Sequence, residues 1–113
     1  MVYGPMIRSA TLLTEVPLGE RHVARQYHEV VSAGSIEYRF VVAIFAAGDD
    51  EPCLFVTSER NQMAGESGGG SHFLCVFESD THYNLGDHDG WADPDRFFPE
   101  SLRVAADRLD LDP

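Results

Sequence analysis

The sequence predicts an α+β fold: an antiparallel sheet of three to five strands with a C-terminal amphipathic helix packed on one face. Residues 36–46 alternate in the manner of a strand, and a turn at 48–52 leads back into a second apolar run at 53–58. Near the C-terminus, apolar residues recur at helical spacing. A chain of 113 residues fits one small acidic globular domain, residues 1–113.

The N-terminal third gives a weaker pattern. Residues 6–16 carry β-branched and apolar side chains, which favours a strand. In residues 20–33, Val23, Tyr27 and Val30 fall at i, i+4 and i+7, as on one face of a helix. A strand over 27–32 is the competing interpretation. We prefer the helix, so the expected fold includes an N-terminal helix on the same sheet.

The middle of the chain predicts a loop and then a second hairpin. Residues 59–72 have no apolar periodicity and contain four Gly, which is typical of a flexible loop. Residues 73–78 predict a third strand, and residues 82–85 a short strand that pairs with it.

The C-terminal helix has a clear start. Asp93 can accept hydrogen bonds from the free N–H groups of the first turn, and Pro94 suits the first helical position. An interior proline clashes with the preceding turn. Because of Pro99, we expect a short turn at 94–97 and a main helix from Pro99 to Leu109.

The charge of the chain is strongly negative. There are 19 acidic and 8 basic residues, all eight of the latter Arg, for a net charge of −11. Nucleic-acid binding and anionic membrane surfaces both require clustered cations, so the charge disfavours them. It favours a protein partner of basic character, or serves solubility alone.

The two cysteines indicate a reducing compartment. Cys53 and Cys75 both lie in apolar runs, which predicts buried free thiols. No segment approaches the roughly 20 apolar residues of a membrane span. We therefore expect a cytoplasmic protein.

Residues 80–95 are rich in Asp and His, the side chains that bind divalent cations. His82 and His88, with Asp87 or Asp89, could form a site with one position open to water. A calcium loop does not fit, because Arg96 would stand where a bidentate Glu belongs. The competing interpretation is a solvated turn whose Asp side chains cap backbone N–H groups.

The expected function is that of a non-enzymatic protein-interaction or regulatory inhibitor module, since no catalytic constellation is evident. The residues expected to contact the partner are Asp49, Asp50, Glu51, Asp87, Asp89 and Trp91. One alternative is a divalent-metal-binding domain or metal-dependent hydrolase that uses His82, Asp87, His88 and Asp89. Another is a DNA mimic whose carboxylates imitate phosphates. Self-association through a sheet edge is a further expectation.

Overall fold

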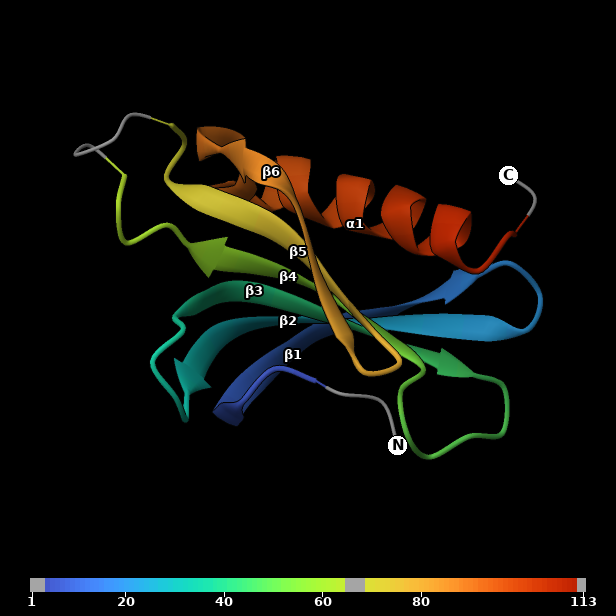
Figure 1. The fold of residues 1–113 in the computed structure, drawn as a ribbon. Coiled ribbons are helices and arrows are strands. Elements are labelled where there is room, and N and C mark those ends of the chain that lie inside the picture. Colours follow the sequence, from blue (N-terminus) through green and yellow to red (C-terminus); the bar gives the residue numbers. More distant parts are fainter. Residues whose placement is uncertain (1–3, 65–68, 112–113) are drawn as a thin grey trace.

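The computed structural model describes residues 4–64 and 69–111. Six antiparallel strands form one sheet in which each strand pairs with its neighbours in sequence, and a helix lies across one face (Figure 1). A single 3-10 turn, η1, connects the last strand to the helix. The elements are β1 (Ile7–Leu18), β2 (His22–Ser32), β3 (Tyr38–Ala46), β4 (Leu54–Arg60), β5 (His72–Glu78), β6 (Thr81–His88), η1 (Asp89–Ala92) and α1 (Pro94–Arg108).

The predicted antiparallel sheet with a C-terminal helix is confirmed, but the number of strands is six, not three to five. The expected strands at 36–46, 53–58 and 73–78 correspond to β3, β4 and β5. The expected loop at 59–72 is shorter than predicted, because β4 continues to Arg60 and β5 begins at His72. Of that loop, residues 65–68 lie outside the described part of the chain.

The predicted N-terminal helix is wrong, because residues 22–32 form β2, paired with β1 and β3. The register between β1 and β2 shifts three times, and Glu29 takes a positive φ of 49°. One of these shifts places an extra residue in β2 around Glu29, which moves the two-residue alternation of that strand by one position. Val30 therefore falls on the side occupied by Tyr27, against the core of the sheet face without the helix. This displaced spacing imitates a helical face.

Helix α1 is a single element of 15 residues. Asp93 caps it as predicted, accepting a hydrogen bond from the N–H of Asp95 at 3.0 Å. The expected break at Pro99 does not occur, because Pro99 lies inside the helix on its exposed side. The carbonyl that Pro99 leaves without an intrahelical donor belongs to Asp95, which is also exposed, so water can satisfy it.

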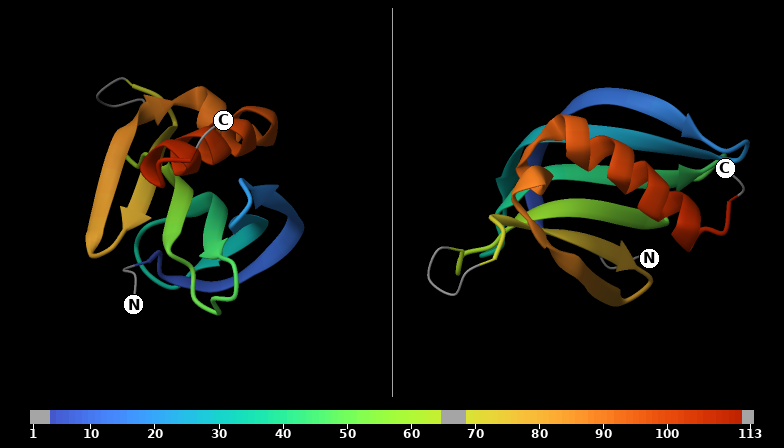
Figure 2. Two further views of the ribbon diagram at one scale, coloured as in Figure 1. Left: turned by 90° about the vertical axis from the view of Figure 1, so that its right-hand side faces the viewer. Right: turned by 90° about the horizontal axis from the view of Figure 1, so that it is seen from above.

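The two faces of the sheet carry different cores. Between the sheet and α1, Phe97 and Phe98 pack against Phe40, with ring centroids 5.5 and 5.0 Å from it. Views along and above the helix show it lying over the middle strands (Figure 2). The opposite face holds a smaller buried cluster of Tyr38, Val41 and Phe77. Both faces of the central strands are therefore covered, which explains why β3 is apolar on both sides beyond Phe40.

The hairpin connections divide the loops between two ends of the sheet. Leu54 pairs with Glu78, so the β3–β4 turn and the β5–β6 turn lie at one end. Arg60 pairs with His72, and His72 with His88, so the β4–β5 connection and η1 lie at the other. Within residues 4–64 and 69–111, no helix is long and apolar enough to cross a membrane.

Candidate functional site

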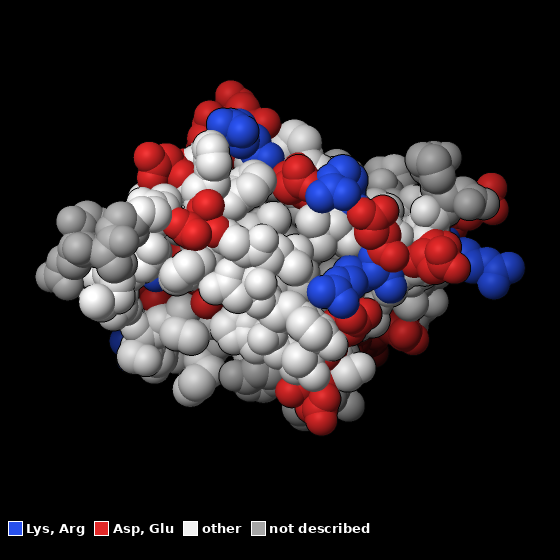
Figure 3. Space-filling view, turned by 45° about the horizontal axis from the view of Figure 1, so that its top comes forward, with Lys and Arg blue, Asp and Glu red and all other residues white. Residues whose placement is uncertain are grey.

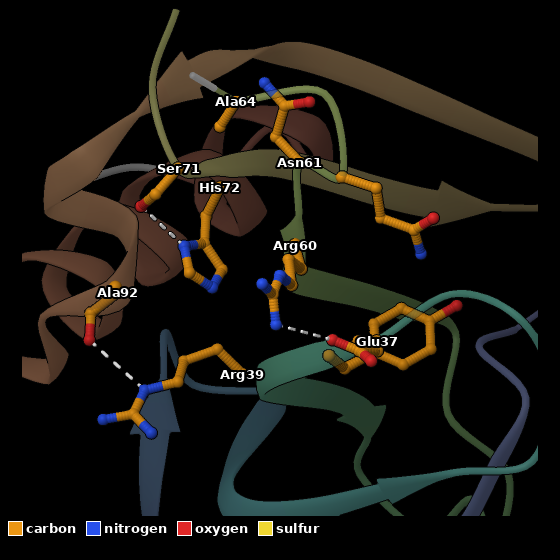
Figure 4. Close-up of a pocket in the computed structure, with 10 residues that line it drawn as sticks. Glu37, Arg39, Arg60, Asn61, Ala64, Ser71, His72 and Ala92 are labelled. Atoms are coloured by element: carbon orange, nitrogen blue, oxygen red, sulfur yellow. Dashed lines mark hydrogen bonds and ion pairs between the residues drawn. The ribbon is translucent and has the colours of Figure 1, made fainter. Parts of the chain in front are cut away.

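A polar pocket lies at the sheet end that carries the β4–β5 connection and η1 (Figure 4). Its volume is about 530 Å³. Its side chains come from β3 and β4, from the start of β5 and from the connecting segments. The lining residues are Glu37, Tyr38, Arg39, Arg60, Asn61, Gln62, Ala64, Ser71, His72 and Ala92. We call it the arginine pocket.

Strand register places the cationic residues of the arginine pocket together. Arg60 and His72 are direct cross-strand partners at the ends of β4 and β5. Arg39 extends from β3 towards η1, where its Nε donates to the carbonyl of Ala92 at 3.4 Å. The guanidinium of Arg60 donates to the carboxylate of Glu37 at 3.3 Å. A guanidinium carries five N–H donors, so each of these arginines retains donors for a ligand.

The surroundings of His72 in the pocket favour its neutral form. Burial lowers the pKa of His72, the positive charges of Arg39 and Arg60 lower it further, and Asp89 partly opposes them. Its Nδ1 lies 2.8 Å from the hydroxyl oxygen of Ser71. A neutral imidazole beside two guanidinium groups is suited to receiving an anion, since an anion would offset both positive charges.

The electrostatics of the arginine pocket are opposite to those of the chain. Two of the eight arginines line it, and among the described lining residues Glu37 is the one carboxylate. Arginine recognises carboxylate and phosphate by paired hydrogen bonds. The arrangement can therefore bind an anionic group, although the net charge of the chain is −11.

The residues predicted to bind a metal are spread along β6 and into the start of η1. His82 pairs with Phe77 and His88 with His72, so the two histidines lie six positions apart, or about 20 Å of strand. Asp87 accepts a hydrogen bond from the N–H of Gly70, and Asp89 accepts one from the N–H of Ser71 at 2.8 Å.

His88, another member of the predicted metal-binding set, also accepts a hydrogen bond from the backbone. The Nδ1 of His88 accepts a hydrogen bond from the N–H of Gly90 at 2.8 Å. A Cβ at Gly70 would lie 2.4 Å from the backbone of His88, so the connection into β5 needs glycine where it crosses the end of β6. Asp87 and Asp89 thus fasten the β4–β5 connection to β6 and η1, and His88 caps η1, as in the capping interpretation.

His82 belongs to a different group of side chains. Its Nε2 lies 2.7 Å from Oε2 of Glu59, and Cys75 lies beside both. Among the residues the structure describes, this is the one group of three or more His, Cys, Asp or Glu side chains close enough to hold a metal ion. Sequence reasoning assigned Glu59 to a loop and so missed the group. If the predicted strand is extended beyond residue 58, Thr57 and Glu59 lie two residues apart in it. Their side chains then share one face of the sheet, which is the signal that points to this group.

The residues predicted to contact a partner lie at both ends of the sheet. Asp49, Asp50 and Glu51 are exposed in the β3–β4 turn. Asp87, Asp89 and Trp91 lie at the other end, beside the arginine pocket. The backbone carbonyl of Trp91 accepts a hydrogen bond from the hydroxyl of Ser58 at 2.6 Å, and its ring packs partly buried against the core under α1.

Comparison of the chain with protein-family models, with curated proteins and with solved structures gave no match.

Proposed function

We propose that this protein is a non-enzymatic interaction module that binds a partner protein by accepting a carboxylate of the partner in the arginine pocket. The observation that carries the proposal is the convergence of Arg39, Arg60 and His72 around one cavity in a chain of net charge −11. An acidic chain gains nothing in solubility from grouping its few cations in a hollow, so a recognition role is the better explanation.

The dimensions and chemistry of the pocket support a carboxylate ligand. Its volume of about 530 Å³ falls within the range of known small-ligand sites. Arg39 and Arg60 approach from different strands, so a carboxylate between them could accept hydrogen bonds from both. The amides of Asn61 and Gln62 add neutral groups that can bond a peptide backbone.

The net charge acts over a longer range than the pocket. At physiological salt, charges are screened over about 8 Å, so the field of the exposed carboxylates guides the approach of a partner and the pocket fixes its final position. A partner that is basic overall and presents one acidic anchor satisfies both features. Free Cys53 and Cys75 suit a reducing compartment, and we propose a cytoplasmic location.

The alternative functions receive less support. A DNA mimic needs carboxylates along one elongated face, whereas Asp49–Glu51 and Asp87–Asp89 lie at opposite ends of the sheet. On the face around α1, acidic side chains are scattered among arginines and uncharged surface (Figure 3). For a hydrolase that uses His82, Asp87, His88 and Asp89, the carboxylates of Asp87 and Asp89 are already engaged by backbone N–H groups.

The proposal is tested by affinity capture with matched variants. The wild type, an Arg39→Gln/Arg60→Gln double variant and an Arg96→Gln/Arg103→Gln control are immobilised and exposed to lysate of the source cells at low salt. We expect a partner that the wild type and the control retain and the pocket variant loses. Binding of the purified partner should then weaken at least about 100-fold in the pocket variant, since losing two charge-assisted contacts costs about 3 kcal/mol or more.

Two results would contradict the proposal. One is equal retention of the partner by the wild type and the pocket variant. The other is an identified partner whose acidic residues can all be neutralised to amides without loss of binding. Circular dichroism of each variant controls for folding.

A further inference from the structure

A second group of functional side chains lies on the sheet face opposite α1, apart from the arginine pocket. We infer that Glu59, Cys75 and His82 form a binding site for a single Zn²⁺-like cation. The three residues come from β4, β5 and β6, and their ligand atoms all lie within 4.8 Å of one another. This inference does not depend on the proposed function.

Strand register explains the convergence. Cys75 pairs with Thr57 on β4 and with Asn84 on β6. Glu59 and His82 are each two residues from those partners, so both lie diagonal to Cys75 on the same face. Their side chains reach over Cys75 from either side and meet at 2.7 Å between Oε2 of Glu59 and Nε2 of His82.

The donor set matches the chemistry of zinc. Thiolate, imidazole and carboxylate are its three ordinary protein ligands, and three protein ligands with one position left for water are typical of open zinc sites. Hard cations such as Ca²⁺ and Mg²⁺ prefer all-oxygen ligand sets, so a site containing Cys75 disfavours them.

The distances require only small adjustments. Zinc bonds of about 2.0–2.3 Å at tetrahedral angles separate ligand atoms by about 3.3–3.8 Å. The Glu59–His82 pair at 2.7 Å would open by roughly half an ångström to reach that separation. The widest pair, at no more than 4.8 Å, would close by about 1 Å, which side-chain rotation can supply.

Neighbouring groups hold the ligands in place. The hydroxyl of Thr57 donates to Oε2 of Glu59 at 2.8 Å, the kind of outer contact that orients a ligating carboxylate. The imidazole of His82 stacks on Phe77, with centroids 4.1 Å apart and planes 12° from parallel. This stacking fixes the plane in which its nitrogens point.

Burial gives the site a closed side and an open side. Glu59 and Cys75 are buried, whereas the His82 side chain is 26% exposed. A cation can therefore enter past His82, and water can take the fourth position there. A purely structural role explains the group less well, because three apolar side chains would fill this part of the sheet without the cost of burying a carboxylate.

The inference is tested on the full chain after chelator treatment and gel filtration. Zn²⁺ added under calorimetry should bind with one-to-one stoichiometry. Co²⁺ should produce the near-ultraviolet thiolate-to-cobalt charge-transfer band and the intense visible bands of a four-coordinate site. The charge-transfer band requires a cysteine ligand, so histidine and carboxylate groups elsewhere on the surface cannot produce it.

Three variants assign the ligands. Cys75→Ser should abolish the charge-transfer band, and His82→Gln should weaken Zn²⁺ binding at least about 100-fold, since even outer contacts are worth 10–100-fold. His88→Gln, a histidine of the same strand outside the group, should leave both unchanged. Absence of the cobalt band in the wild type, or its persistence in Cys75→Ser, would overturn the inference.

Discussion

Truncating Phe97 tests whether α1 is held to the sheet by its aromatic residues. Phe97 is completely buried, and its ring lies 5.5 Å from that of Phe40 and 5.4 Å from that of Phe98. Phe→Ala substitutions in a core cost about 3–5 kcal/mol, and aromatic pairs contribute about 0.5–1.5 kcal/mol beyond buried area. With two such pairs lost, we expect Phe97→Ala to lower the free energy of unfolding by about 4 kcal/mol.

A loss of that size is a large part of the total stability of a domain, about 5–15 kcal/mol. It should lower Tm by roughly 15 °C. Urea unfolding followed by the fluorescence of Trp91, the one tryptophan of the chain, measures the change. The midpoint should fall while the slope with denaturant stays the same, because the surface exposed on unfolding barely changes.

Leu12→Ala is the control, since Leu12 lies half exposed on β1, far from the helix. It should change stability by no more than about 0.5 kcal/mol. A loss below about 1.5 kcal/mol for Phe97→Ala would show that the site collapses around the missing ring, and would refute the view that this contact secures the helix.

Three further outcomes follow from single residues. Asp93→Ala should cost about 1 kcal/mol in thermal or chemical unfolding, because it removes the cap of α1, and an equal loss from the exposed Asp107→Ala would contradict this. Burial and nearby arginines lower the pKa of His72, so the folded state binds its proton less readily than the unfolded state. The stability contributed by its neutral imidazole is present above about pH 6.5, the ordinary pKa of histidine, and is lost as the pH falls below that value. His72→Gln should therefore flatten that part of the plot of stability against pH. NMR titration should place the pKa of His72 below 6.5 and show it rising when acetate binds. Burial raises the pKa of Cys75, so a thiol reagent at neutral pH should modify the half-buried Cys53 first and Cys75 only on unfolding, and rapid modification of both would contradict the burial.

The parts of the fold that follow from local rules could be predicted. The alternation through Val42 and Ile44 and the capping of α1 by Asp93 depend on nearby residues, and both are present. Strand β2 does not show the period of a strand because an extra residue around Glu29 displaces Val30 by one position. The break predicted at Pro99 fails for a different reason. A proline inside a helix is locally unfavourable, but its exposed position and the packing of Phe97 and Phe98 outweigh that cost.

The candidate sites depend on pairings that sequence does not display. Arg39, Arg60 and His72 are up to 33 residues apart. They meet only because the start of β3, the end of β4 and the start of β5 lie at the same end of the sheet. The sequence predicts His82 as a metal ligand together with its neighbours in the chain. In the structure its partners are Glu59 and Cys75, which lie far from it in sequence. Asp and His cluster in sequence at residues 80–95, but most of these side chains bond to the backbone.

The order of elements along the chain has a consequence for biosynthesis. Every strand precedes α1, so a nascent chain completes the sheet while the apolar face around Phe40, Val42 and Val56 still lacks its cover. Hairpins between consecutive strands close quickly, because their contacts are local. The exposed face then persists until residues 94–108 fold against it, and during that interval it is a target for chaperones and for aggregation. Truncations within α1 should therefore accumulate as insoluble protein, while changes confined to the polar surface of the helix should not.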